Sequence, residues 1–190
     1  MLSRYQVSEV LYPDLAFESA VYDEWLKLIK EREIKSTLAQ AGQQISLGDW
    51  VVIELLSPRS HPLSVTESDV DNNAAVLRLS LNEVSFLLTA DIMREAEFEL
   101  LYDRANLRST VRKVAHHGAD TSTTLEFLAV VNPQLAVISV GADNDYGHPS
   151  VEVMARLIER VDSANIYRTD EDGTIEFTTH GERLWVKTER

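Results

Sequence analysis

Short apolar runs alternate with amphipathic segments along all 190 residues of this sequence. No internal repeat, low-complexity tract or linker rich in proline, glycine and serine interrupts the alternation. Such a pattern favours an α/β or α+β fold, because each element can bury an apolar face against its neighbours. The chain is also long enough to bury one sizeable core. We therefore expect a single domain over 1–190.

The spacing of apolar residues predicts where the elements lie. One helix is capped by Ser150, which follows Pro149 and precedes Glu152 in the first turn. A tight turn at 81–82 joins two strands into a hairpin. Further turn signals lie at 171–173 and 180–181, where residues tolerant of positive φ occur. Helices are predicted over 21–33, 93–102, 124–131 and 150–161, and strands over 7–11, 36–39, 50–56, 74–79, 84–88, 111–115, 135–140, 166–168, 174–179 and 184–187.

Composition narrows the chemistry that the chain can use. It contains no cysteine, so disulfides and thiolate ligands are excluded and a metal would be held by histidine, carboxylate or water. Such ligands suit manganese or zinc. No apolar stretch approaches the roughly 18 residues that a membrane-spanning helix needs, and the N-terminus lacks the pattern of a signal peptide. We expect a soluble chain without a membrane segment, cytoplasmic by default.

The formal net charge of −13 argues against non-specific affinity for DNA, since binding a phosphate backbone relies on lysine and arginine. A local basic patch could exist within an acidic surface. Arg104, Arg108, Arg112 and Lys113 are the candidates for such a patch. The alternative is that these residues form the solvated end of a helix.

Polar residues follow the ends of three predicted strands, and the first of them is Asp91. It ends the apolar run 86–91 just before the helix expected near Met93. A carboxylate beyond a strand end is well placed to bridge cations. The alternative is that Asp91 caps the following helix.

The second strand end carries the adjacent pair His116 and His117, followed by Gly118. Adjacent histidines within a strand point to opposite faces, but at a strand end one can turn toward a metal while the other supports it. Gly118 would allow close approach of the backbone. The alternative interpretation is a pair of surface histidines in a loop.

The third strand end leads into 141–149, which contains His148. His148 could donate a hydrogen bond to a phosphate or act as a general acid; alternatively it shapes the turn before the next helix. If the three strands are neighbours, Asp91, His116, His117 and His148 converge on one rim. Convergence of this kind favours a functional site.

In order and spacing, four segments together resemble the closing motifs of the metallo-β-lactamase domain of ComEC-type competence proteins. Three upstream segments also resemble central parts of that domain, and together the segments cover nearly the whole chain. The closing motifs are T-A-D-I at 89–92, K-V-A-H-H-G at 113–118, V-I-S-V-G-A-D-N-D-Y-G-H-P at 137–149 and Y-R-T-D-E-D-G-T-I at 167–175; the upstream ones are V-S-E-V-L-Y-P-D at 7–14, G-Q-Q-I-S-L-G-D at 42–49 and D-N-N-A-A-V-L-R-L at 71–79.

The resemblance implies a fold and a chemistry. The fold would be an α/β, metallo-β-lactamase-like αββα sandwich whose N-terminal part is truncated. Two divalent cations at one edge would hold a hydroxide that attacks a phosphodiester such as DNA. Asp91 matches the bridging carboxylate, one of His116 and His117 matches a histidine ligand, and His148 matches a histidine near the cleft.

The sequence also departs from that family pattern. The H-x-H-x-D-H motif, which supplies most of the ligands, would precede residue 1 and is missing. His61, the single histidine before the H-H pair, stands beside Pro62 and is interpreted as a loop residue. Ala90 replaces the usual glycine, and Ala119 stands where serine commonly follows H-H-G. The ligand set in this chain is therefore incomplete.

Two hypotheses follow. The chain is part of a metal-dependent phosphodiesterase of the DNA-uptake class, or it is a catalytically inactive domain that serves as a binding or assembly module. A missing N-terminal half could complete the site as a partner, and the strand at 7–11 could offer an unpaired edge to a second copy. If the chain is part of a competence channel, it would lie on the extracytoplasmic face of the bacterial membrane.

Overall fold

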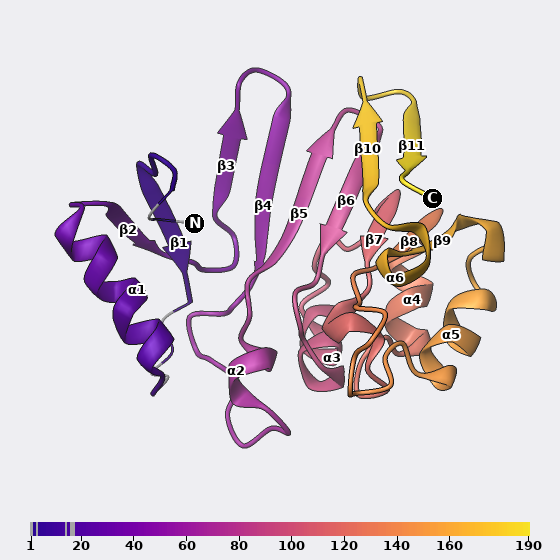
Figure 1. Cartoon of the computed structure of the whole chain (residues 1–190), viewed down its shortest axis with the longest axis horizontal. Helices are drawn as coiled ribbons and strands as arrows, with labels where there is room; N and C mark the ends of the chain where they lie inside the picture. The colour runs from indigo at the N-terminus through magenta and orange to yellow at the C-terminus, as the bar shows by residue number, and fades with distance from the viewer. Residues whose placement is uncertain (1, 3, 14, 16–17) are drawn as a thin grey trace.

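A computed structural model describes residue 2, 4–13, 15 and 18–190, and confirms the predicted α/β class. Its largest element is a seven-stranded mixed sheet with the order β3-β4-β5-β6-β7-β8-β9 (Figure 1). The strands follow this order along the chain as well. Their bounds are Gln44–Leu47, Val51–Ser57, Val76–Leu81, Val84–Leu88, Val111–Lys113, Leu135–Ile138 and Ile166–Arg168.

Two kinds of connection build this sheet. Strands β3 to β6 pair antiparallel through hairpins or longer loops, whereas β6, β7, β8 and β9 pair parallel. Each parallel connection carries one α-helix, as parallel crossovers require: α3 (Arg94–Tyr102), α4 (Leu125–Val131) and α5 (Val151–Ile158). The carboxyl ends of β6 to β9 therefore meet at one edge of the sheet.

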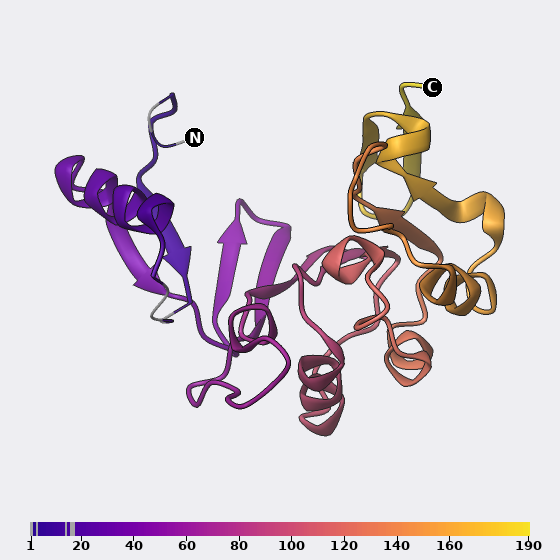
Figure 2. The same ribbon diagram turned by 60° about the horizontal axis from the view of Figure 1, so that its bottom comes forward.

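The core lies between the parallel strands and these three helices, which gather on one side of the sheet (Figure 2). One buried cluster joins Leu87 of β6 to Leu100 of α3 and Phe127 of α4. A second joins Ile138 of β8 to Leu157 of α5. Each helix is amphipathic and covers the sheet with its apolar face. This packing fixes the positions of the strand ends.

Two smaller sheets flank the large one. β1 (Glu9–Tyr12) and β2 (Lys35–Leu38) pair parallel around the helix α1 (Ala20–Glu31), and β10 (Ile175–Thr179) pairs antiparallel with β11 (Leu184–Thr188). Among the described residues, β2 is the one strand paired with β1. The last residue of the V-S-E-V-L-Y-P-D segment, Asp14, lies outside the described residues.

The predicted helices and strands are all present, with ends shifted by a few residues. The strand expected over 111–115 ends at Lys113, because Ala115–Gly118 form a tight 3₁₀ turn. The edge strand β3 was not predicted. The sequence patterns also missed α2 (Asp69–Asn72), the 3₁₀ turn at Ser163–Asn165 and α6 (Thr169–Asp172), which are too short for a helical period. No helix in the described part of the chain is long and apolar enough to cross a membrane.

Of the four residues considered for a basic patch or a solvated helix end, Arg104, Arg108, Arg112 and Lys113, the structure excludes Arg112 from both. The side chain of Arg112 is fully buried and paired with Glu97, with its guanidinium 4.8 Å from the ring centre of Phe127. Arg112 lies on β7 and faces the core beneath α3 and α4. A charge buried in that position is out of reach of a phosphate in solution.

Candidate site at the carboxyl ends of the parallel strands

The structure brings the predicted site residues together. Asp91 follows β6, His116 and His117 follow β7, and His148 lies in the loop that follows β8. These strands are adjacent and parallel, so their ends share one edge. A pocket of about 450 Å³ lies at this edge and is lined by His117, Ser139, Val140, Gly141, Asn144, Tyr146, His148 and Thr169.

His117 is oriented by the backbone of the neighbouring strand end. Its Nδ1 lies 2.6 Å from the carbonyl oxygen of Ser139. A carbonyl can only accept, so Nδ1 carries the hydrogen and, in the neutral ring, Nε2 keeps its lone pair. Nε2 lies 3.6 Å from Oδ2 of Asp91. Two electron-rich atoms that face each other in this way are suited to share a proton or a cation.

The two histidines do not lie in a strand. Both adopt left-handed backbone conformations, with φ of 48° at His116 and 54° at His117. The His116 ring lies with its centre 6.1 Å from that of His148, and its buried Nδ1 has no hydrogen-bond partner among the residues that the structure describes. His117 is therefore the histidine of the pair that faces Asp91, a choice that the sequence left open.

Gly118 completes this turn, and the expectation of close backbone approach is confirmed. Its φ is +87°, and a Cβ added there would lie 2.6 Å from Cβ of Pro149. The carbonyl oxygen of Gly118 accepts a hydrogen bond from the amide of Ser150 at 2.9 Å. The H-H-G turn thus packs directly against the residue that follows His148.

Two threonines hold the strand ends in place. The hydroxyl of Thr89, which is fully buried, donates to the carbonyl of Lys113 at 2.7 Å and ties β6 to β7. The hydroxyl of Thr169 lies 2.7 Å from both the amide and the carbonyl oxygen of Val140, tying β8 to β9. Between Thr89 and Asp91, Ala90 has a φ of 45°, a conformation that favours glycine.

The alternative interpretation of Asp91 as a helix cap is wrong. The helix α3 is capped at Met93 without a side-chain bond from its own cap residue. Instead, Oδ1 of Asn72 accepts from the amides of Met93 and Ala96 at 3.0 and 3.3 Å. Because Asn72 satisfies those amides, the carboxylate of Asp91 does not cap the helix and instead lies beside His117.

The loop that follows the histidines is fixed by residues that the sequence did not single out. Glu97 accepts hydrogen bonds from the amides of Thr123 and Thr124 at 2.7 and 2.8 Å. Arg156 of α5 donates to the carbonyls of Ser122 and Thr123 at 3.0 and 3.1 Å. Only long-range contacts assign these roles, so no local pattern could have revealed them.

His148 lies in a loop that its own residues make rigid. The side-chain oxygen of Asn144 accepts from the amide of His148 at 2.9 Å, and its nitrogen donates to the carbonyls of Gly141 and His148. The ring of Tyr146 stacks on that of His148, with centres 5.7 Å apart and planes 17° apart. The loop interpretation and the site interpretation of His148 are thus compatible.

We expect the imidazole of His148 to titrate below the ordinary histidine value. Burial lowers its pKa, charges on His116 and His117 lower it further, and Asp120 opposes the shift. Because the folded pKa is depressed, stability is fully present above about pH 6.5 and falls as pH drops toward the lowered pKa. A proton NMR titration checks this. A midpoint at or above the ordinary value would contradict the arrangement.

Asp91 and His117 suit two positions around a metal ion. Two ligands at about 2.0–2.1 Å from one tetrahedral zinc lie roughly 3.4 Å apart, close to the 3.6 Å observed. However, no group of three or more histidine and carboxylate side chains that could hold a metal occurs within the described residues. A catalytic zinc site needs about three protein ligands, so these residues do not complete one.

Lys113 already places a positive charge near this pair. Its Nζ lies 4.0 Å from Oδ1 of Asp91. Burial lowers the pKa of Lys113, and the negative charge of Asp91 opposes that effect. The amine also donates to the carbonyl of Ala90 at 3.3 Å. Asp91 is therefore partly neutralised by Lys113 on one side and faces His117 on the other.

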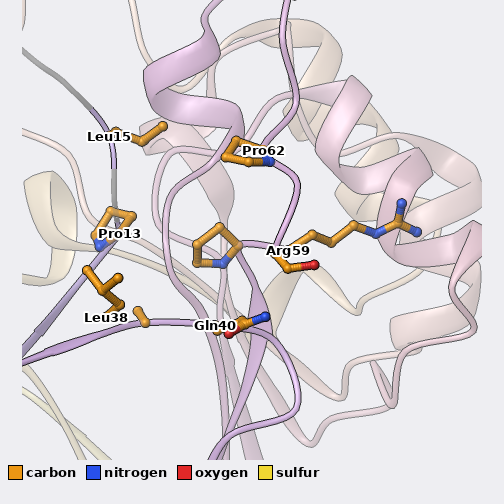
Figure 3. Close-up of a pocket in the computed structure, with 9 residues that line it drawn as sticks. Pro13, Leu15, Leu38, Gln40, Arg59 and Pro62 are labelled. Carbon is orange, nitrogen blue, oxygen red and sulfur yellow. The ribbon is translucent and has the colours of Figure 1, made fainter.

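A second pocket, of about 190 Å³, lies between the end of β2 and the loop at 58–62 (Figure 3). Its charged lining residue, Arg59, reaches away from the cavity and pairs with Glu99 and Asp103. The described residues that line it include no histidine or carboxylate; they are Pro13, Leu15, Leu38, Ala39, Gln40, Pro58, Arg59, Ser60 and Pro62. The site at the strand ends is the better candidate for chemistry. His61, as predicted, is an exposed loop residue next to this pocket.

The chain is similar in sequence to parts of known competence proteins. It is 34% identical over 138 residues to ComE operon protein 3 of Bacillus subtilis (strain 168), and the aligned region covers 71% of this chain and 17% of that protein. It is 33% identical over 132 residues to competence protein ComA of Neisseria gonorrhoeae, and the aligned region covers 68% of this chain and 18% of that protein. The chain thus spans less than a fifth of the length of these curated relatives. No family model matches it.

Among solved structures, the metallo-β-lactamase fold protein YhfI from Bacillus subtilis is similar with a TM-score of 0.48 and 10% sequence identity. That similarity covers 95% of this chain and 64% of YhfI.

Proposed function

This chain belongs to the ComEC-type competence family, and on that premise we propose that it supplies part of a divalent-cation site for phosphodiester hydrolysis during DNA uptake. In this proposal Asp91 and His117 are two ligands, and the remaining ligands come from residues outside this chain. Asp91 and His117 would hold the cation, and the chemistry that it would supply is Lewis-acid activation of water and of a phosphate ester. The domain would have the metallo-β-lactamase fold.

The geometry of His117 is the observation that supports the proposal. The carbonyl of Ser139 holds Nδ1 and leaves Nε2 facing Asp91 at 3.6 Å. Histidine ligands of metals characteristically donate their second nitrogen to a carbonyl or carboxylate in this way. His148, whose backbone amide donates to Oδ1 of Asn144 at 2.9 Å, lines the same pocket as His117, and its ring would donate a hydrogen bond to a bound phosphate.

The first test is calorimetric titration of the chain with Zn²⁺ and Mn²⁺. We expect weak binding of one equivalent, because two ligands are fewer than a complete site requires. Asp91→Ala and His117→Ala should each abolish the binding. His61→Ala is the matched control, since it removes an exposed histidine far from the strand ends. Binding that survives both site variants would contradict the proposal.

The second candidate function is a binding or assembly module without catalysis. It is favoured by the lack of a group of three metal-binding side chains within the described residues, and by the net charge of −13. This candidate predicts no heat of metal binding and no cleavage of DNA in the presence of Mn²⁺. The same titration, followed by a cleavage assay, therefore separates the two.

A further inference from the structure

Tyr146 presents a large aromatic face to solvent at the mouth of the pocket. Its side chain is 83% exposed, so burial in the core does not explain its position. Its ring lines the same pocket of about 450 Å³ as His117 and stacks on His148. An exposed ring that rests on a second ring offers a flat surface for a third one.

This pair of rings is held before any ligand arrives. Asn144 bridges the loop from Gly141 to His148 with three hydrogen bonds of 2.9 Å. The inner face of the stack is supported by His116, whose ring lies edge-on to His148 with centres 6.1 Å apart. The free-energy cost of ordering the loop when a ligand stacks on Tyr146 would therefore be small.

The charge around the loop indicates which part of a ligand would be recognised. Asp143 and Asp145 precede Tyr146 in the loop and are exposed, so they repel a phosphate. The pocket wall itself is mainly apolar or uncharged, as Val140 and Gly141 are. The outer face of Tyr146 thus suits a planar ring rather than a phosphate, and the nucleobases are planar rings that stack on tyrosine.

We propose that Tyr146, backed by His148, is a stacking platform for an unpaired base of single-stranded DNA. The choice of DNA as the polymer rests on the function proposed above, whereas the stacking itself does not. Because Tyr146 and His117 line one pocket, a base on Tyr146 would place its own phosphate toward the pair of Asp91 and His117. The base must be unpaired, since a duplex keeps base faces covered.

The test is fluorescence anisotropy of a labelled oligothymidylate, measured in a chelator so that no metal contributes. We expect Tyr146→Ala to raise the Kd by about 5- to 150-fold, equivalent to about 1–3 kcal/mol. Tyr146→Phe should keep the wild-type Kd, because it retains the ring. Tyr102→Ala is the matched control, as Tyr102 is also 83% exposed but lies at the end of α3.

An abasic oligonucleotide of the same length separates bases from phosphates. It should bind wild type and Tyr146→Ala equally weakly. The inference is overturned if Tyr146→Ala binds oligothymidylate like wild type, if the abasic strand binds wild type as tightly as oligothymidylate does, or if wild type shows no binding. If no metal binds but Tyr146→Ala still raises the Kd for oligothymidylate, the proposed metal site alone is contradicted. If metal binds as expected but Tyr146→Ala leaves that Kd unchanged, the stacking platform alone is contradicted.

Discussion

Glu97→Ala is expected to lower the free energy of unfolding by about 3–5 kcal/mol, the cost of breaking a buried ion pair. Glu97 and Arg112 are both fully buried, with Oε1 of Glu97 3.0 Å from Nη2 of Arg112. The substitution would leave the Arg112 charge uncompensated and deprive the amides of Thr123 and Thr124 of their acceptor. Urea denaturation measures the change.

Two further variants separate the possible causes. Glu126→Ala, on the exposed face of α4, should change stability by no more than about 0.5 kcal/mol. Glu97→Ala combined with Arg112→Met should cost less than Glu97→Ala alone, because the double variant leaves no unpaired charge in the core. A single variant Glu97→Ala within about 1 kcal/mol of wild type would show that the pair does not organise the loop after the histidines.

Gly118→Ala is expected to cost about 2–5 kcal/mol. A left-handed backbone costs about 1–2 kcal/mol for a residue other than glycine, and overpacking adds about 1–3 kcal/mol. The first term follows from the φ of +87°, and the second from the new Cβ, which would lie 2.6 Å from Cβ of Pro149. Because Pro149 directly follows His148, the clash with Pro149 should also displace His148.

Gly42→Ala is the matched control for this variant. Gly42 has a nearly equal φ of +90°, but a Cβ there would meet nothing within 4 Å. The difference in unfolding free energy between the two variants therefore isolates the clash with Pro149. The NMR signals of His148 should move in Gly118→Ala and stay in place in Gly42→Ala. Equal losses of stability and unmoved His148 signals would show that the two loops are not coupled.

The amphipathic pattern was sufficient to predict the main elements, because periodicity and caps are local properties. The helix capped by Ser150 is an example, since the Ser150 hydroxyl accepts from the amide of Val153 as the sequence indicates. The short α6 and the edge strand β3 were missed because neither carries a complete apolar period. The 3₁₀ turn of the histidines was missed for a different reason, as their left-handed conformations resemble nothing in a strand pattern.

The convergence of the four candidate residues was predictable from the sequence, but the contacts that orient them were not. Asp91, His116, His117 and His148 converge because their strands are parallel neighbours, as the sequence analysis required. Their orientation depends on partners that are distant in sequence. Ser139 selects the nitrogen of His117, and Asn72, far from Asp91 in sequence, takes the amides that Asp91 could have capped. The buried Arg112 shows the same limit, since its partner Glu97 lies on another element.

The arrangement of His117 beside Asp91 is tested most directly by nitrogen NMR of the His117 imidazole, recorded while Zn²⁺ is added. In the free protein, the hydrogen should reside on Nδ1, as the 2.6 Å contact with the Ser139 carbonyl requires. Zinc should then shift Nε2 of His117, and Asp91→Ala should remove that shift at the same zinc concentration. A free protein with the hydrogen on Nε2, or a zinc shift that survives in Asp91→Ala, would contradict the assignment of these two residues as paired ligands.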